Sequence, residues 1–180
     1  MPLWGWVAIG SGVLLLVAAG VAAVVLGWRA YERKALLRLL VRAEAVEAAA
    51  SALLETFTRL ANGSDSELEV FAEDPGSPER HALAEIHTRA NLLADELDRM
   101  PLPRKLIPVA EALADAAYTI CEQSGCVRDE DTDGVALERL LSIDLERVQS
   151  YTDKARQITT GACDVCGLDE TAVYGGGLYL

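Results

Sequence analysis

The sequence lacks the usual signatures of catalysis: it has no glycine-rich phosphate loop, no nucleophile elbow and no His-Glu-x-x-His pair. Its only histidines, His81 and His87, are six residues apart. At 100° per residue their side chains would point about 120° apart around a helix, so they cannot share one metal ion. We therefore expect histidines at the rim of the fold and a protein that is not an enzyme.

Positive charge is also scarce. The 180 residues carry 16 Lys and Arg against 28 Asp and Glu, which gives a formal net charge of −12. Nucleic-acid binding needs a basic face, so this acidity argues against a nucleic-acid partner. The first 28 residues carry no charged side chain, whereas residues 29–42 carry five basic side chains and one acid. The chain therefore consists of an uncharged segment, a basic segment and an acidic domain.

The uncharged segment predicts a transmembrane anchor. Residues 7–26 are mainly Val, Leu, Ala and Gly, and as a helix they would span about 30 Å, the thickness of the bilayer hydrocarbon. A cleaved signal peptide is the alternative, but it requires basic residues before a shorter apolar stretch. By the positive-inside rule we predict a single-pass protein of the cell membrane, with its N-terminus outside and its C-terminal domain in the cytoplasm.

Two sets of residues are expected to contact the membrane or a neighbouring helix. Tryptophans and basic residues flank the span and would lie at the membrane interface, where basic residues attract anionic lipids: Trp4, Trp6, Trp28, Arg29, Arg33, Lys34, Arg38 and Arg42. Small residues four apart would let another helix approach closely, although they are common in spans without such contacts: Ala19, Ala23 and Gly27. The expected partners are membrane lipids and proteins, in a homodimer or a larger membrane complex.

The remaining chain predicts an all-α fold. Apolar residues recur at spacings of three and four from residue 36 to residue 60, with no helix breaker before Asn62. Further helices are predicted over residues 78–100, 104–123 and 133–160, and Gly161 is expected to end the last one. No segment alternates polar and apolar residues for long enough to predict a sheet. Such helices with short connections predict an antiparallel four-helix bundle that continues from the transmembrane helix.

We accordingly divide the chain into four parts. They are the anchor (1–28), a basic juxtamembrane collar with the first bundle helix (29–61), the remaining bundle helices (62–160) and a CxxC-containing flexible tail (161–180). Residues 173–180 are apolar and aromatic around three glycines. Disorder is the expected state of this terminus, and a docking peptide is the alternative.

Four cysteines form two pairs, Cys121 with Cys126 and Cys163 with Cys166. Such pairs suggest zinc, but in the predicted bundle a helix of about 26 residues would separate them by nearly 40 Å. Three interpretations stay open: reduced thiols packed as small apolar residues, a metal site that the second pair completes with another chain, and a redox or disulfide role. We expect no cofactor, with zinc as the alternative.

The residues Asp129, Asp131, Asp133 and Gly134 match the start of an EF-hand calcium loop. The bidentate Glu that such a loop needs at its far end is replaced by Leu140. We interpret the acids as a turn that caps the next helix, with weak divalent-ion binding as the alternative.

Taken with the charge pattern, these features favour a single-pass, membrane-anchored, non-catalytic helical-bundle scaffold or adaptor, an accessory subunit of a membrane assembly. The alternative is a metal- or redox-responsive membrane protein that uses the two cysteine pairs. Metal analysis and thiol counting would distinguish the two hypotheses.

Overall fold

The computed structural model describes residues 3–128, 130–131 and 134–168, with side chains described from residue 19 onward. The tail residues 169–180 and two residues of the acidic loop, Asp129 and Asp133, lie outside the described residues. All regular structure in the described part is helical, which confirms the all-α class. The helices are α1 (Leu3–Ala61), α2 (Asp65–Glu73), α3 (Pro78–Asp98), the 3-10 helix η1 (Arg104–Leu106), α4 (Ile107–Ser124), α5 (Gly134–Leu141) and α6 (Leu145–Cys166).

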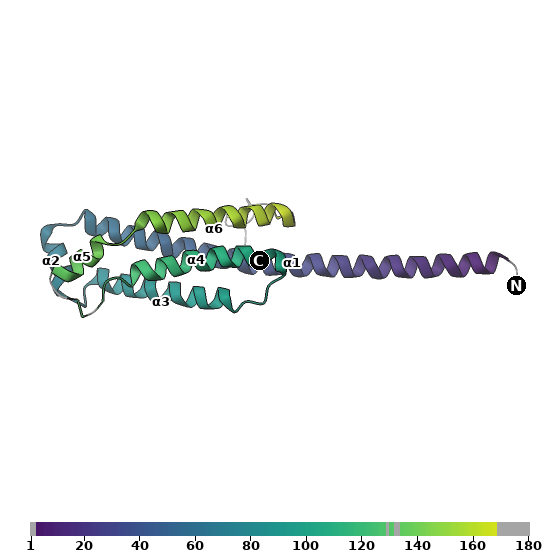
Figure 1. The fold of residues 1–180 in the computed structure, drawn as a ribbon, viewed down its shortest axis with the longest axis horizontal. Helices are drawn as coiled ribbons and strands as arrows, with labels where there is room; N and C mark the ends of the chain where they lie inside the picture. Colours follow the sequence, from purple (N-terminus) through teal and green to yellow (C-terminus); the bar gives the residue numbers. More distant parts are fainter. Residues whose placement is uncertain (1–2, 129, 132–133, 169–180) are drawn as a thin grey trace.

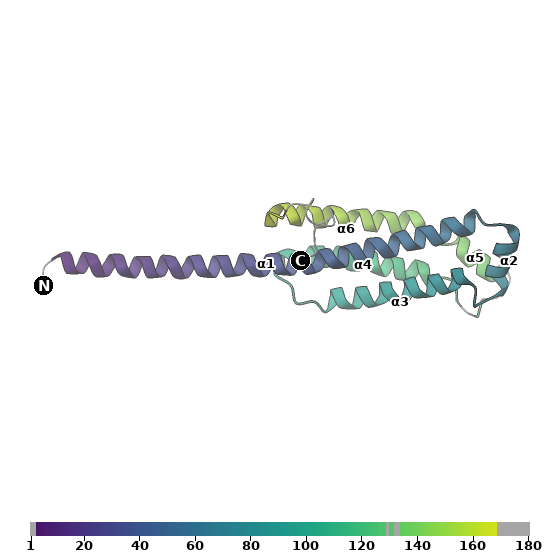
Figure 2. The same ribbon diagram turned by 180° about the vertical axis from the view of Figure 1, so that it is seen from behind.

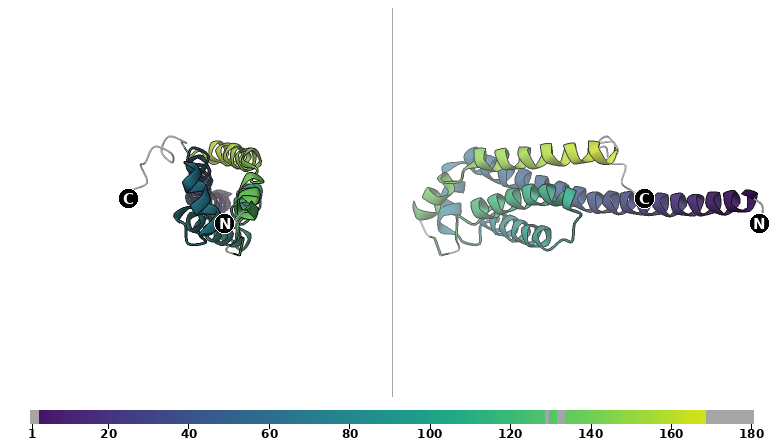
Figure 3. Two further views of the ribbon diagram at one scale, coloured as in Figure 1. Left: turned by 90° about the vertical axis from the view of Figure 1, so that its left-hand side faces the viewer. Right: turned by 45° about the vertical axis from the view of Figure 1, so that its right-hand side comes forward.

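Four of these helices, α1, α3, α4 and α6, form an antiparallel bundle (Figures 1 and 3). Helix α1 packs against the other three, and α4 packs between α3 and α6. The short helices α2 and α5 pack on each other at the end of the bundle where α1 finishes, which we call the distal end. The opposite end, where α1 leaves the bundle, is called the base.

Helix α1 is far longer than the other helices and projects beyond the base (Figure 2). Its side chains from residue 19 to residue 31 are exposed, and burial begins at Glu32. The predicted apolar seam then faces the core, as the helical spacing requires. Its buried members are Leu36, Leu39, Ala43, Val46, Leu53 and Leu60, and Ala50 and Phe57 are partly buried.

The structure divides the predicted fourth helix into α5 and α6. The break lies at residues 142–144, where the Asp144 side chain accepts a hydrogen bond from the Arg147 N–H at 2.8 Å and so caps α6. The Asp144 N–H donates in turn to the Gln123 side chain at 2.6 Å. Two hydrogen bonds therefore stabilise a helix start that the apolar spacing alone did not predict.

Helix α6 also continues through Gly161, where we expected it to end. Outside the glycine's own helical turn, no atom of the described residues lies within 4 Å of the position that a Cβ at residue 161 would occupy, so the helix passes this glycine without a special contact. The helix ends instead at Gly167, which has the left-handed φ of 64° that is typical of helix ends. Cys163 and Cys166 consequently lie within α6, and the predicted tail begins later than residue 161.

The predicted transmembrane anchor is contradicted by the structure. Among the described residues, no helix is long and apolar enough to cross a membrane. The side chains of residues 3–18 lie outside the described part. We therefore withdraw the prediction of a single-pass protein of the cell membrane with its N-terminus outside and its C-terminal domain in the cytoplasm.

Candidate functional site

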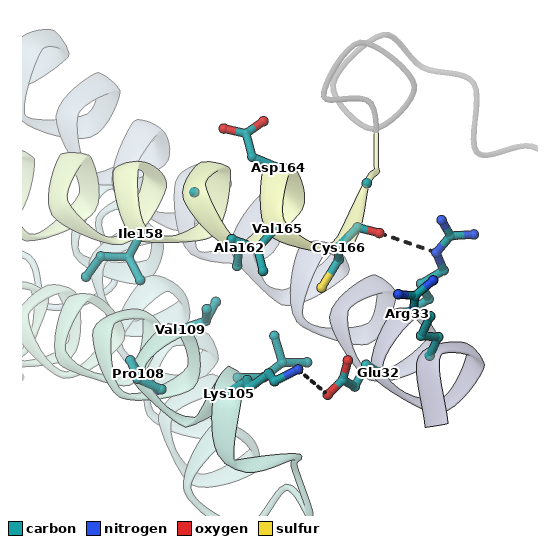
Figure 4. Close-up of a pocket in the computed structure, with 14 residues that line it drawn as sticks. Glu32, Arg33, Lys105, Pro108, Val109, Ile158, Ala162, Asp164, Val165 and Cys166 are labelled. Carbon is teal, nitrogen blue, oxygen red and sulfur yellow. Dashed lines mark hydrogen bonds and ion pairs between the residues drawn. The ribbon is translucent and has the colours of Figure 1, made fainter. Parts of the chain in front are cut away.

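A pocket of about 620 Å³ opens at the base of the bundle (Figure 4). It forms because the antiparallel arrangement returns the end of α6 to the point where α1 leaves the bundle, beside η1 and the start of α4. Its apolar walls come from Val109 of α4 and from Ile158 and Val165 of α6. We call this cavity the base pocket.

Glu32 of α1 is the buried acid of the base pocket. Its Oε1 accepts a hydrogen bond from Trp28 Nε1 at 2.7 Å and lies 3.2 Å from Lys105 Nζ in η1. The hydrogen bond from Trp28, together with that from Lys105 and the attraction of nearby cations, lowers the pKa of Glu32 although burial acts in the opposite direction. Glu32 is therefore a carboxylate at neutral pH and links α1 to η1.

Arg33 connects α1 to the end of α6. Its Nε donates to the carbonyl oxygen of Cys166 at 3.4 Å (Figure 4). The last carbonyls of a helix lack partners within the helix and carry partial negative charge, so a guanidinium is favourable there. Gly167 follows directly and lines the pocket with Arg33. The contact holds the end of α6 against the projecting helix.

The lining of the base pocket carries charges of both signs. Three cations, Arg29, Arg33 and Lys105, line the pocket together with the carboxylates Glu32 and Asp164. The lining therefore has a formal charge of 3 − 2 = +1, in a chain whose net charge is −12. Apolar walls beside a basic mouth favour a ligand that is apolar and carries negative charge.

The residues expected at a membrane interface lie in several different environments. Arg29 and Arg33 line the base pocket, Trp28 donates to Glu32 of that pocket, and Lys34 and Arg38 are exposed on the bundle surface. The Arg42 guanidinium lies 3.3 Å from the Glu96 carboxylate and so links α1 to α3. Trp4 and Trp6 lie outside the residues whose side chains are described. The spacing of four between Trp28 and Glu32 is a sequence signal for their contact on one helix face.

The small residues Ala19, Ala23 and Gly27 lie on the projecting part of α1 and are exposed. No atom of the described residues lies within 4 Å of a Cβ built at Gly27. The structure therefore leaves this predicted helix-contact face open, and the contact itself stays a prediction.

The two cysteine pairs lie at opposite ends of the bundle. Cys121 and Cys126 are at the distal end of α4, whereas Cys163 and Cys166 are at the base end of α6. Cys163 lies 18 positions after Leu145 in α6, which corresponds to about 27 Å along the helix. None of the four forms a disulfide. Among the described residues, no group of three or more His, Cys, Asp or Glu side chains could hold a metal ion.

His87 contacts Cys121, and the sequence analysis missed this pair. His87 Nδ1 lies 2.9 Å from the Cys121 carbonyl oxygen and 3.4 Å from its Sγ. Because a carbonyl can only accept, the shorter contact places the proton on Nδ1, so this nitrogen cannot take the proton of the thiol. Burial also raises the pKa of the Cys121 thiol. The pair is therefore not arranged as a base-activated nucleophile.

The Asp131 carboxylate is used within the protein. It accepts a hydrogen bond from the Arg128 N–H at 2.8 Å and forms an ion pair with Arg139 at 3.0 Å. The residue is 6% exposed. These contacts occupy the carboxylate that the calcium-loop alternative required, and they favour the interpretation of this segment as a structural acidic turn.

Comparison with known proteins gives no relative for this chain: no family model, no curated protein and no solved structure matches it.

Proposed function

We propose that the protein is a non-catalytic helical-bundle scaffold or adaptor that binds a protein partner through the projecting part of α1. The observation that supports this proposal is the exposure of apolar side chains along residues 19–28, including Val24 at 71% and Leu26 at 65%. Exposed apolar surfaces of this kind on a folded protein mark interaction sites. A helix that is apolar all round is normally covered on several sides.

The chemistry of the projecting segment indicates what would cover it. The small residues Ala19, Ala23 and Gly27 would let a partner helix approach closely, because the distance between helix axes depends on the side chains at the contact. The exposed basic residues Lys34 and Arg38 follow further along α1. We therefore expect a helical partner with an apolar contact face and acidic residues beside it.

The fold supports a scaffold role because the binding segment and the bundle share one helix. Residues 19–61 of α1 run without a break from the exposed segment into the apolar core. A partner held on the projecting part would therefore keep a defined orientation to the acidic bundle. The bundle has its own closed core, so binding need not complete the fold.

The proposal can be tested with substitutions in the full-length chain. Val24→Ser with Leu26→Ser should weaken binding of a stoichiometric companion, recovered from the native host and then purified, by about tenfold or more. Val41→Ser is the matched control, because Val41 is 56% exposed on the bundle part of the same helix. Absence of a stoichiometric companion, equal binding by all variants, or association with lipid vesicles in place of a protein would each overturn the proposal.

A metal- or redox-responsive role is the second candidate, and it would use the two cysteine pairs, Cys121 with Cys126 and Cys163 with Cys166. His87 contacts Cys121, but its Nδ1 donates to the Cys121 carbonyl oxygen and would have to lose that proton before it could bind a metal. Each pair supplies two thiolates, which are fewer ligands than a structural zinc site uses. Metal analysis and thiol counting on protein purified under reducing conditions test this role. Four reactive thiols without bound metal would remove it.

A further inference from the structure

The base pocket has the character of a peptide-binding site. Its volume of about 620 Å³ lies within the range of 300 to 1,000 Å³ that is common for ligand sites. Val109 and Ile158 form apolar walls, and Val165 at the mouth is 80% exposed. These side chains leave apolar surface uncovered beside the cations of α1.

Arg29 is the cation at this site that remains available for a ligand. Among the described residues it forms no hydrogen bond or ion pair, whereas Lys105 is paired with Glu32 and Arg33 donates to the Cys166 carbonyl. Arg29 and Arg33 are one helical turn apart, so their guanidinium groups can reach the same ligand. The pocket therefore combines apolar walls with unneutralised positive charge at its mouth.

The chain itself supplies a segment of matching chemistry. Gly167 turns the backbone at the pocket, and the Leu168 N–H donates to the Cys163 carbonyl oxygen at 3.0 Å while its side chain packs against the core. The next residues in the sequence are the acids Asp169 and Glu170, followed by the apolar and aromatic residues Val173, Tyr174, Leu178, Tyr179 and Leu180. The segment therefore presents acidic residues followed by apolar residues, and the base pocket presents cations beside apolar walls. The two are complementary in charge and in hydrophobicity.

The tether makes this segment a better candidate than a free peptide. Twelve residues follow Leu168, and an extended chain covers about 3.3–3.6 Å per residue, so all of them can reach the pocket. A segment attached at the mouth by a short connection has an effective concentration in the millimolar range. A partner peptide would have to compete with that concentration.

We propose that residues 169–180 dock into the base pocket of their own chain. The acids Asp169 and Glu170 bind at Arg29 and Arg33, and the apolar residues beyond them cover Ile158 and Val165. This inference concerns the base pocket and does not depend on the partner proposed for the projecting helix.

A charge exchange in the full-length chain tests the proposal. Hydrogen–deuterium exchange of the amides in residues 169–180 should be slower in the natural protein than in Arg29→Glu or in Glu170→Arg, by about two- to fivefold, the change that one exposed ion pair supports. Combining the two substitutions should restore the slow exchange. The matched control is Arg59→Glu, the same change of charge on an exposed residue at the distal end of α1, which should have no effect.

A second measurement follows the pocket walls directly. The methyl signals of Ile158 and Val165 should shift when Tyr174 and Tyr179 are both replaced by Ser, because the aromatic rings leave the pocket. Equal amide exchange in all variants, or methyl signals that do not respond, would overturn the proposal. Protection that depends on protein concentration would also overturn it, because the occupant would then be the same segment of a second copy.

Discussion

The Nη2 atom of Arg80 lies 2.8 Å from the carbonyl oxygen of Asp131, so the first turn of α3 is tied to the connection between α4 and α5. Arg80 is 4% exposed and also donates to the carbonyl oxygens of Phe71 at 2.7 Å and Ala72 at 2.8 Å. Its guanidinium lies 5.4 Å from the centre of the Phe71 ring. One buried cation thus satisfies carbonyl groups from two separate segments and joins the elements of the distal end.

Replacement of Arg80 by Met should therefore destabilise the protein strongly. The substitution keeps an unbranched apolar stem but leaves several buried carbonyl groups without donors, and we expect a loss of about 3 kcal/mol in the free energy of unfolding. Urea denaturation followed by circular dichroism measures this change. Arg99→Met is the control, because the exposed Arg99 forms a surface ion pair with Asp95 one turn earlier and should change stability by less than about 0.5 kcal/mol. Similar losses in both variants would contradict the role of Arg80.

Two glycines should respond to alanine in opposite directions. A Cβ at position 125 would lie 2.6 Å from His87 Nδ1, so Gly125→Ala must displace the His87 ring and break its hydrogen bond to Cys121. We expect a loss of about 1–2 kcal/mol. Among the described residues outside its own helical turn, a Cβ at position 161 of α6 meets no atom within 4 Å, so Gly161→Ala should add up to about 1 kcal/mol. Thermal or urea unfolding of both variants measures the change in the free energy of unfolding. A change of the same sign in both variants would contradict the prediction.

The cap of α6 gives a third prediction. Asp144→Ala removes the oxygen that accepts from the Arg147 N–H and should lower the free energy of unfolding by about 1 kcal/mol. Asp144→Asn keeps an acceptor oxygen and should retain most of the stability. The same urea experiment measures both variants. An Asn variant as unstable as the Ala variant would show that the cap hydrogen bond does not contribute to stability.

The core of the bundle could be predicted from the sequence because the apolar residues that form it recur at the spacing of a helix. Residues such as Leu39, Val46 and Leu53 recur at the helical period, and the structure buries all three. The division between α5 and α6 was not predictable in this way, because it depends on Gln123 of another helix accepting from the Asp144 N–H. The local signal for this break was the single N-cap residue Asp144, which the apolar spacing around it did not indicate.

The candidate site was predicted less well for the same reason. Glu32 and Lys105 are 73 residues apart in the sequence, and His87 and Cys121 are 34 apart. Only the packing of antiparallel helices brings these side chains together. The uncharged residues before Arg29 led us to predict a membrane span, but no helix among the described residues is long and apolar enough to form one.

The environment of Glu32 predicts a pH dependence of stability with a definite sign. The hydrogen bond from Trp28, supported by Lys105, lowers the pKa of Glu32 in the folded protein below the ordinary value of 4.5. Folding therefore favours the carboxylate, and the resulting stability is present above pH 4.5 and is lost as the pH falls through the lower pKa of the folded state. Glu32→Gln removes this titration while keeping an oxygen that can accept from Trp28. The difference in unfolding free energy between the natural protein and the variant should thus be constant near neutral pH and shrink below pH 4.5. Parallel curves throughout the acid range would show that Glu32 is not ionised more readily in the folded protein than in the unfolded chain.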